Sequence, residues 1–266
     1  MTRATALDRR RSRGERILGA LSRSPDDPMV AAEEAITLGD ALADLLRFFP
    51  DLRERVAGRR VLDFGCGSGR QAVALAAAGA AYVLGVDTNP TALARARELA
   101  RREGRAVEFA TRIPEAVEGS FDVVISKDSM EHFAEPATEL ARMAAALRPG
   151  GALLVTFGPP WFAPAGSHMQ FFTAVPWVNL LFRERTVMRV RSRYRHDGAM
   201  RYEDVESGLN RMTISRFERL LGTSGLRVES NDYRCVKGLD FLGRMPLLRE
   251  LFINNVSCVL RTGRPA

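Results

Sequence analysis

Residues that could do chemistry follow three apolar runs of the chain. The first run, Val61–Phe64, contains Asp63 and leads into Gly65, Cys66, Gly67, Ser68 and Gly69. Glycines at alternate positions let the backbone turn tightly and approach a ligand without a Cβ in the way. A helical pattern follows, and the first N–H groups of a helix face whatever is bound there. The spacing is G-x-G-x-G and not the G-x-G-x-x-G of dinucleotide sites, so it predicts a nucleoside ligand without a pyrophosphate.

The second and third apolar runs also end in polar residues. The run Tyr82–Val86 is followed by Asp87, whose carboxylate can accept hydrogen bonds from both hydroxyls of a ribose, and then by Thr88 and Asn89. The third run, from Phe121, ends at Ser126 and Lys127. In an open parallel sheet, ligands bind beyond the carboxyl ends of the strands. We therefore expect these residues to contact the same ligand as the glycine loop.

Four features in this order resemble the class I S-adenosylmethionine (SAM)-dependent methyltransferases, in the branch that acts on small molecules. They are the acid and glycine loop, Asp87, the F-D-x-V pattern from Phe121 and the L-x-P-G-G pattern from Leu147, and together they span residues 61–157. The resemblance implies SAM as the cofactor and methyl transfer as the reaction. It departs from the family after the third strand, where an acid usually lies near the adenine. Here either Thr111, through its hydroxyl, or the backbone makes that contact. The implied cofactor-binding residues are Asp63, Gly65, Cys66, Gly67, Gly69, Asp87, Thr88, Asn89, Thr111, Ser126 and Lys127.

The reacting end of the site is expected just after Lys127. Asp128-Ser129-Met130-Glu131-His132 resembles the E-x-x-E-H motif of ubiquinone-pathway O-methyltransferases and small-RNA 2′-O-methyltransferases, which holds a divalent metal. Asp128 replaces the first Glu of that motif. His168 lies just after the fifth predicted strand, so its imidazole and that of His132 could converge on one substrate.

Three interpretations of this cluster stay open. In the first, His132 or His168 is a general base, assisted by Glu131, because a neutral imidazole with an ordinary pKa of about 6.5 can take a proton from an attacking hydroxyl. In the second, Asp128, Glu131, His132 and His168 bind a divalent metal that acidifies the hydroxyl. In the third, Glu131 and His132 only form local hydrogen bonds at the start of the next helix.

Apolar periodicity predicts the framework that positions these residues. Strands and helices alternate, which predicts a Rossmann-like α/β fold with a doubly wound, mostly parallel sheet of seven strands. The predicted strands are 61–64, 82–86, 107–110, 121–126, 152–157, 226–229 and 255–260, and the predicted helices are 14–22, 29–49, 68–78, 90–103, 136–147 and 214–221. We expect residues 1–58 to form a tail and helical cap and 59–266 to form the SAM-binding domain, with residues 1–13 disordered.

The stretch 158–212 interrupts this alternation and predicts an inserted cap. It contains both tryptophans and the aromatic run 169–182. Substrate pockets are mostly apolar, so the insertion indicates a small apolar or aromatic acceptor, although a dimer contact or a small core of its own is an alternative. Residues 188–195 alternate apolar and Arg, which predicts a strand with one arginine face at 189–195. That face could hold an acidic group or nucleic acid, or be an exposed edge.

Composition narrows the class of protein. The chain has 266 residues and a net charge of +7, with a surplus of five positive charges in each of the segments 1–24 and 183–201. No apolar run approaches the ~20 residues of a membrane span, and three cysteines without an even framework favour a reduced, cytoplasmic location. We expect O-methylation of a small metabolite, no nucleic-acid partner and a possible homodimer. The alternatives are a metal-assisted RNA 2′-O-methyltransferase and a non-catalytic SAM-fold binding protein.

Overall fold

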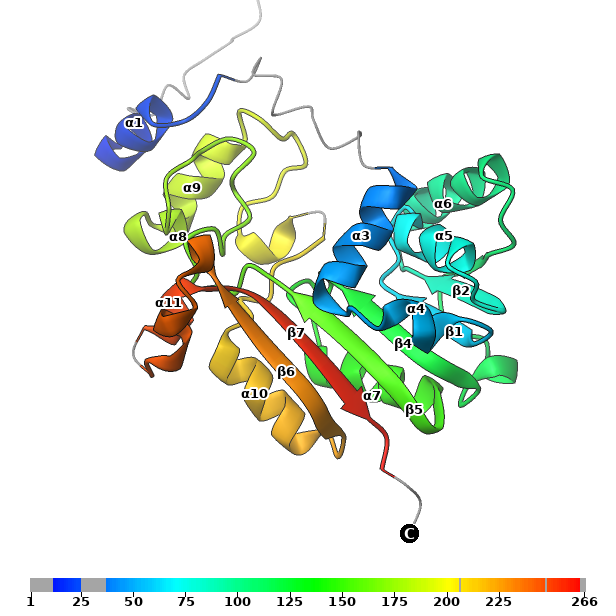
Figure 1. Cartoon of the computed structure of the whole chain (residues 1–266). Helices are drawn as coiled ribbons and strands as arrows, with labels where there is room; N and C mark the ends of the chain where they lie inside the picture. The colour runs from blue at the N-terminus through cyan, green and yellow to red at the C-terminus, as the bar shows by residue number, and fades with distance from the viewer. Residues whose placement is uncertain (1–11, 25–36, 206, 247, 264–266) are drawn as a thin grey trace, which may run out of the picture.

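The computed structural model describes residues 12–24, 37–205, 207–246 and 248–263, and a seven-stranded sheet runs through it (Figure 1). The spatial order is β3-β2-β1-β4-β5-β7-β6. β7 is antiparallel to both neighbours, and every other pairing is parallel. The predicted doubly wound, mostly parallel sheet is therefore confirmed. The strands are β1 (Arg60–Phe64), β2 (Tyr82–Val86), β3 (Glu108–Ala110), β4 (Phe121–Lys127), β5 (Leu147–Phe157), β6 (Arg227–Cys235) and β7 (Ile253–Arg261).

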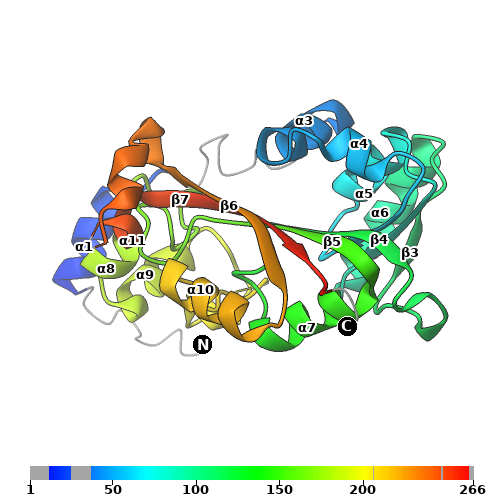
Figure 2. The same ribbon diagram turned by 60° about the horizontal axis from the view of Figure 1, so that its bottom comes forward.

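Helices cover both faces of this sheet, as Figure 2 shows. On one face lie α3, α4, α5 and α6, and on the other lie α7 and α10. The α-helices are α1 (Arg13–Ala20), α3 (Leu38–Phe48), α4 (Leu52–Val56), α5 (Arg70–Ala77), α6 (Pro90–Arg102), α7 (Pro136–Ala146), α8 (Val178–Leu181), α9 (Glu184–Arg191), α10 (Ile214–Thr223) and α11 (Arg249–Phe252). Short 3₁₀ turns are η2 (Glu115–Val117), η3 (Tyr202–Asp204), η4 (Val236–Gly238) and η5 (Asp240–Arg244).

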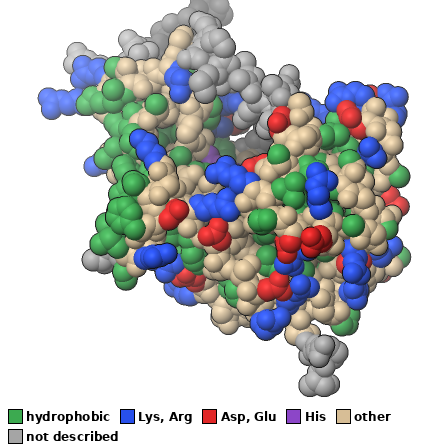
Figure 3. All heavy atoms as spheres, in the orientation of Figure 1, with side chains coloured by type: hydrophobic (Ala, Val, Ile, Leu, Met, Phe, Trp, Pro, Cys, Tyr) green, Lys and Arg blue, Asp and Glu red, His purple; other side chains and the backbone are tan. Residues whose placement is uncertain are grey.

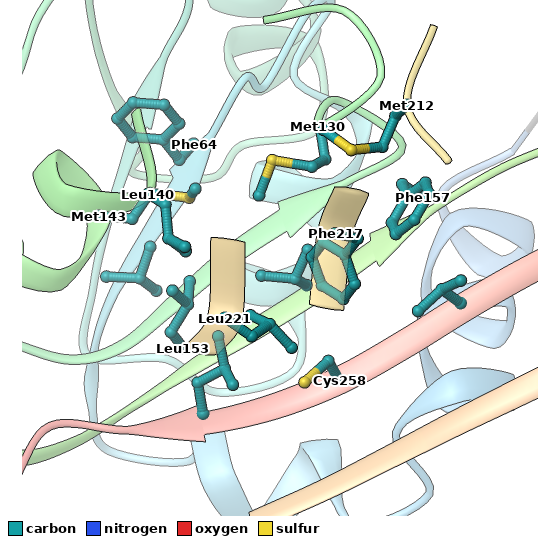
Figure 4. Close-up of a cluster of buried hydrophobic side chains, with 14 of the residues drawn as sticks. Phe64, Met130, Leu140, Met143, Leu153, Phe157, Met212, Phe217, Leu221 and Cys258 are labelled. Atoms are coloured by element: carbon teal, nitrogen blue, oxygen red, sulfur yellow. The ribbon is translucent and has the colours of Figure 1, made fainter. Parts of the chain in front are cut away.

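Two apolar clusters fix these helices to the sheet because successive strand residues point to opposite faces. In β1, Val61 joins the cluster under α3, α4 and α5, whereas Leu62 joins the cluster under α7 and α10. Figure 4 shows the second cluster, where Leu140 of α7 and Phe217 of α10 meet Leu153 of β5. The two faces together hold the carboxyl ends of β1, β2 and β4 in fixed relative positions.

The helix boundaries follow their capping residues. Thr37 and Asp40 form a capping box at the start of α3, so the described part of the predicted helix 29–49 begins there, and residues 29–36 lie outside the described residues. Asn89 caps α6 with Pro90 in its first turn, and Thr213 caps α10 as predicted. Most of the stretch 1–13, predicted to be disordered, lies outside the described residues.

A separate apolar cluster, which we call the cap core, lies in the insertion 158–212. It contains buried residues of that insertion together with Leu18 of α1. The segment after α1 also joins the insertion, since the N–H of Arg23 donates to the carbonyl of Phe172 at 2.7 Å. The N-terminal segment is therefore split, with α1 on the cap and α3 on the sheet. The division at residue 58 stays a prediction.

The predicted arginine-faced strand at 189–195 is wrong, because α9 ends only at Arg191 and irregular backbone follows it. The alternation of apolar and Arg residues suggested a strand, but Val187, Met188 and Val190 all face the cap core. This spacing of buried residues is helical and not extended. Two strand boundaries differ from the prediction by more than two residues. β6 continues to Cys235, and β5 begins at Leu147, where a register shift absorbs the L-x-P-G-G residues.

Candidate functional site

A cavity of about 870 Å³ lies between the carboxyl ends of β1, β2 and β4 and the cap. Figure 3 shows the hollow between these two parts of the molecule. On the sheet side it is lined by Gly65, Gly67, Asp87, Thr88, Asn89, Ala92, Asp128, Ser129, His132 and Phe133. On the cap side it is lined by His168, Met169, Gln170, Phe171, Arg191, Arg195, Asp197, Val205, Ser207 and Leu209.

The three glycines of the loop after β1 have two different tasks. Gly65, Gly67 and Gly69 all have positive φ, at 81°, 51° and 79°. A Cβ on Gly65 would lie 2.6 Å from Ser129 Oγ, and one on Gly69 would lie 2.6 Å from Ala96 Cβ. Around Gly67 nothing lies within 4 Å of such an atom. Gly65 and Gly69 therefore permit close packing, and Gly67 leaves open space on the cavity side.

Asp87 ties this loop to the end of β2. Its Oδ2 accepts from the N–H of Gly67 at 2.8 Å, and its Oδ1 accepts from the N–H of Asn89 at 2.8 Å. A carboxylate oxygen has more than one lone pair. Because Asp87 also lines the cavity, both oxygens can still accept from a ligand with two neighbouring hydroxyls.

Six of the predicted cofactor-binding residues do not line the cavity. Gly69 packs against α6, and Cys66 and Ser126 are buried in the loop and the sheet. Thr111 is exposed beyond the end of β3. The side chains of the remaining two, Asp63 and Lys127, are largely buried.

Asp63 is a buried acid with an unused oxygen. Burial raises its pKa to about 7, and its Oδ2 has no hydrogen-bond partner among the described residues. Lys127 pairs with Asp44 of α3 at 2.8 Å and with Asp128. Lys127 thus holds α3 against the end of β4, where Asp128 faces the cavity.

The two histidines predicted to converge do meet at this cavity. The ring centroids of His132 and His168 are 5.5 Å apart, with an interplanar angle of 78°. Nδ1 of His132 lies 2.6 Å from the carbonyl oxygen of Gly208. A carbonyl only accepts, so Nδ1 carries the proton and Nε2 of the neutral ring has a free lone pair.

His168 has a different environment. Burial, with a smaller contribution from His132, lowers its pKa to about 4. Its Nε2 lies 3.4 Å from the carbonyl oxygen of Pro159, and its backbone φ is 56°. At pH values above about 4 the ring of His168 is therefore neutral. It is a weaker base than an ordinary histidine and is suited to accept or donate a hydrogen bond.

Glu131 points away from the cavity. Its Oε1 accepts from the N–H of Gly158 at the end of β5, at 3.0 Å, and its Oε2 has no partner among the described residues. Burial raises its pKa to about 8. Asp128 is occupied by Lys127 and by the Thr156 hydroxyl at 3.1 Å. Over the described part of the chain, no three His, Cys, Asp or Glu side chains gather as a metal site.

Sequence reasoning missed much of the cap wall. Arg191 is 5% exposed and pairs with Asp197 through two hydrogen bonds of 2.6 and 2.7 Å, which hold the pKa of Asp197 at about 2. The guanidinium of Arg195 lies 5.1 Å from the ring centre of Phe171. Phe171 belongs to the aromatic run that the sequence singles out, but no local signal marks Arg191 and Asp197 as neighbours.

Three observations indicate that the residues of the sheet wall fit an adenosyl cofactor. The open space at Gly67 admits a ligand close to the backbone. Asp87 has lone pairs left for ribose hydroxyls, and Asp63 has one buried oxygen without a partner. The donor set around Asp128, Glu131 and the histidines does not fit a metal, because Glu131 faces Gly158 and Asp128 is held by Lys127.

The fold and this cavity define an α/β protein with a nucleoside-type site at the carboxyl edge of its sheet. Residues 61–151 match the family model described as a methyltransferase domain. The matched residues are therefore similar to a methyltransferase domain, in agreement with the resemblance of the sequence to the class I SAM-dependent enzymes.

Curated relatives agree with this family. The ubiquinone biosynthesis O-methyltransferase of Aromatoleum aromaticum is 38% identical over 105 residues, which is 38% of this chain and 44% of that protein. The enzyme of the same name from Thiobacillus denitrificans is 39% identical over 105 residues, which is 38% of this chain and 45% of that protein. The match thus spans less than half the length of each relative.

A solved structure supports the fold. A SAM-dependent methyltransferase from Mesorhizobium loti superposes with a TM-score of 0.52 at 22% identity, covering 80% of this chain and 96% of the other. None of the helices in the described parts of the chain is long and apolar enough to cross a membrane.

Proposed function

We propose that this protein transfers a methyl group from SAM to a hydroxyl of a small apolar or aromatic metabolite. The observation that carries the proposal is one continuous cavity with two different walls. The glycine loop, Asp87 and His132 lie on the sheet wall, and His168, Met169 and Phe171 lie on the cap wall. The family match and the two O-methyltransferase relatives support the same reaction.

Bound SAM would supply an electrophilic methyl group on a sulfonium. The chain's task is then to hold it and to present an acceptor oxygen in line with it, which by itself gives much of the acceleration. Gly67 and Asp87 would hold the nucleoside, the former by leaving room and the latter by accepting from its hydroxyls. Asp63 would act on the bound cofactor through the backbone of the glycine loop and would not contact it directly.

His132 is the proposed base. Its Nδ1–H is held by the Gly208 carbonyl, so Nε2 can take the proton of the acceptor hydroxyl as the oxygen attacks. His168, with its lowered pKa, would orient that hydroxyl by a hydrogen bond. Glu131 is a positioning residue, since it fixes Gly158 between the two histidine-bearing segments.

Apolar side chains of the cap favour the acceptor class. Met169, Phe171, Val205 and Leu209 line the cavity on the cap side. With α9 helical and Arg191 buried, the arginine face that favoured an RNA substrate is not formed. A small molecule is therefore the proposed partner, and a cytoplasmic location rests on cysteine usage alone.

Transfer of a labelled methyl group tests the proposal. The full chain would be incubated with methyl-labelled SAM and a panel of phenols and aliphatic alcohols, with and without a metal chelator. Label in an O-methyl product that persists with chelator supports it. Retention of SAM without transfer to any acceptor class would favour the non-catalytic alternative, and loss of transfer with chelator would favour the metal-assisted one.

A further inference from the structure

The exposed apolar side chains of this protein gather at one end of the molecule. Nine large apolar residues are exposed in the described parts of the chain, and seven of them lie in or directly beside α1, α8 and the turns η4 and η5. The seven are Ile17, Leu21, Leu180, Leu181, Leu239, Phe241 and Met245. We call these segments the apolar end. The most exposed are Leu181, at 65%, and Phe241, at 62%.

Side-chain contacts join these segments into one surface. Trp177 at the start of α8 meets Phe252 of α11 with ring centroids 6.0 Å apart. The backbone of Gly14 in α1 lies beside Phe182, because a Cβ built there would be 3.8 Å from its ring. Figures 1 and 2 both place α1, α8 and α11 together at the same side of the molecule. Figure 3 shows a broad apolar area along that side, with few acidic side chains.

The charges of the apolar end are almost all positive. Its exposed cations are Arg13, Arg16, Arg183, Arg185, Lys237 and Arg244. Asp240 is the one exposed acid in segments 13–21, 177–185 and 236–245, and its Oδ1 accepts from the N–H of Cys235. The other two acids there are engaged, Glu15 with Arg189 and Glu184 with Arg211. The preceding residues, 1–11, add four Arg and one Asp to the same end of the sequence.

The combination of exposed apolar side chains and exposed cations argues against burial of the apolar end between two copies of the chain. In a two-fold dimer the same surface faces itself, so six cations of one copy would face six of the other. Interface cores are depleted in charge. An anionic lipid surface satisfies both features, because acyl chains take up the apolar side chains and the headgroups attract Lys and Arg.

We propose that the apolar end docks this protein on the surface of an anionic lipid bilayer. Leu181 and Phe241 enter the boundary between headgroups and acyl chains, and the six cations lie at headgroup level. Docking is peripheral and reversible, and it places the cap, with α8 and α1, at the lipid surface. The proposal stands on surface residues alone and does not depend on methyl transfer.

Vesicle sedimentation tests the proposal with the full chain. Vesicles of phosphatidylcholine and phosphatidylglycerol in equal parts should carry the protein down, vesicles of phosphatidylcholine alone should carry down much less, and high salt should release it. Leu181→Glu with Phe241→Glu should weaken binding about tenfold or more. So should Arg183→Glu with Arg185→Glu and Lys237→Glu, since each cation contributes a further several-fold factor.

Val228→Glu is the matched control, because Val228 is exposed at 43% but lies on β6, away from the apolar end. It should bind vesicles as the unaltered protein does. The apolar and the charge variants test the surface separately, and thermal unfolding checks that each is folded. Absence of binding to anionic vesicles, or equal binding by all variants, would overturn the proposal. So would light scattering that finds a dimer which Leu181→Glu with Phe241→Glu converts to a monomer.

Discussion

The two walls of the cavity are built by different means. The sheet wall uses backbone amides and glycines from short stretches of sequence, with Asp87 linking Gly67 and Asn89. The cap wall uses side chains from residues 168–209, held by the Arg191–Asp197 pair and by α1 from the other end of the chain. A backbone-built wall suits a ligand whose shape is constant. A side-chain wall can change its ligand by substitution without disturbing the sheet.

The largest effect should come from the base on the boundary between the walls. His132→Ala should lower kcat by about 10²–10⁴-fold, because a positioned proton acceptor contributes this much. The Kd for SAM should stay close to that of the unaltered protein. Single-turnover kinetics and calorimetry would measure the two quantities.

The third histidine provides the control for that substitution. His196 is exposed and does not line the cavity, so His196→Ala should leave kcat unchanged. If His132→Ala retained full activity, the base would have to be assigned elsewhere.

The next effect belongs to the sheet wall. Asp87→Ala should weaken SAM binding at least tenfold, because hydrogen bonds to a charged group are worth about 1.5–3 kcal/mol each and the loop at Gly67 loses its anchor. Calorimetric titration with SAM would measure the change.

Phe171→Ala on the opposite wall is the comparison. It should raise the acceptor KM and leave the SAM Kd unchanged. Equal SAM affinity for Asp87→Ala and the unaltered protein would remove Asp87 from the cofactor site.

The difference between the two walls also explains which parts of the site could be predicted from the sequence. Of the predicted site residues, Gly65, Gly67, Asp87 and the two histidines line the cavity, because short stretches that follow strand ends reach it. The prediction for Lys127 did not anticipate its partner, since Asp44 lies 83 residues earlier on α3 and only folding brings the two together.

The cap could not be predicted in the same way. The alternation at 188–195 reads as a strand locally, but the apolar residues of the cap, including Leu18 from a distant segment, select a helix for α9. Tertiary burial overrides a short local pattern in such cases. Arg191 and Asp197 pair across a turn, and only the folded backbone shows that their side chains face the cavity.

A third prediction concerns α1, whose described contacts are with the cap. Leu18 is fully buried there, and a Leu→Ala change in a core costs about 2–5 kcal/mol. Leu18→Ala should therefore loosen the cap and raise the acceptor KM several-fold, with the SAM Kd unchanged. Leu45→Ala, at an equally buried position of α3, should instead lower the Tm of the sheet domain without a selective change in KM. A parallel rise of KM and SAM Kd in the Leu18 variant would show that the walls are not independent.

The smallest effect on activity is expected at Glu131, which faces the backbone of Gly158 and not the cavity. Burial raises its pKa from an ordinary value of 4.5 to about 8, so between these values the folded state holds a proton that the unfolded state has released. Stability should therefore fall as pH rises through this window and level off above it.

The variant Glu131→Gln tests this pH dependence, because its side chain cannot ionise. Its Tm should match that of the unaltered protein at the acid end of this pH window and exceed it at the alkaline end, with turnover little changed. Glu131→Ala leaves the Gly158 N–H without its partner and should lower the Tm at every pH. If Glu131→Gln and the unaltered protein showed the same pH dependence of Tm, the buried carboxyl would be ionised throughout and the raised pKa would be wrong.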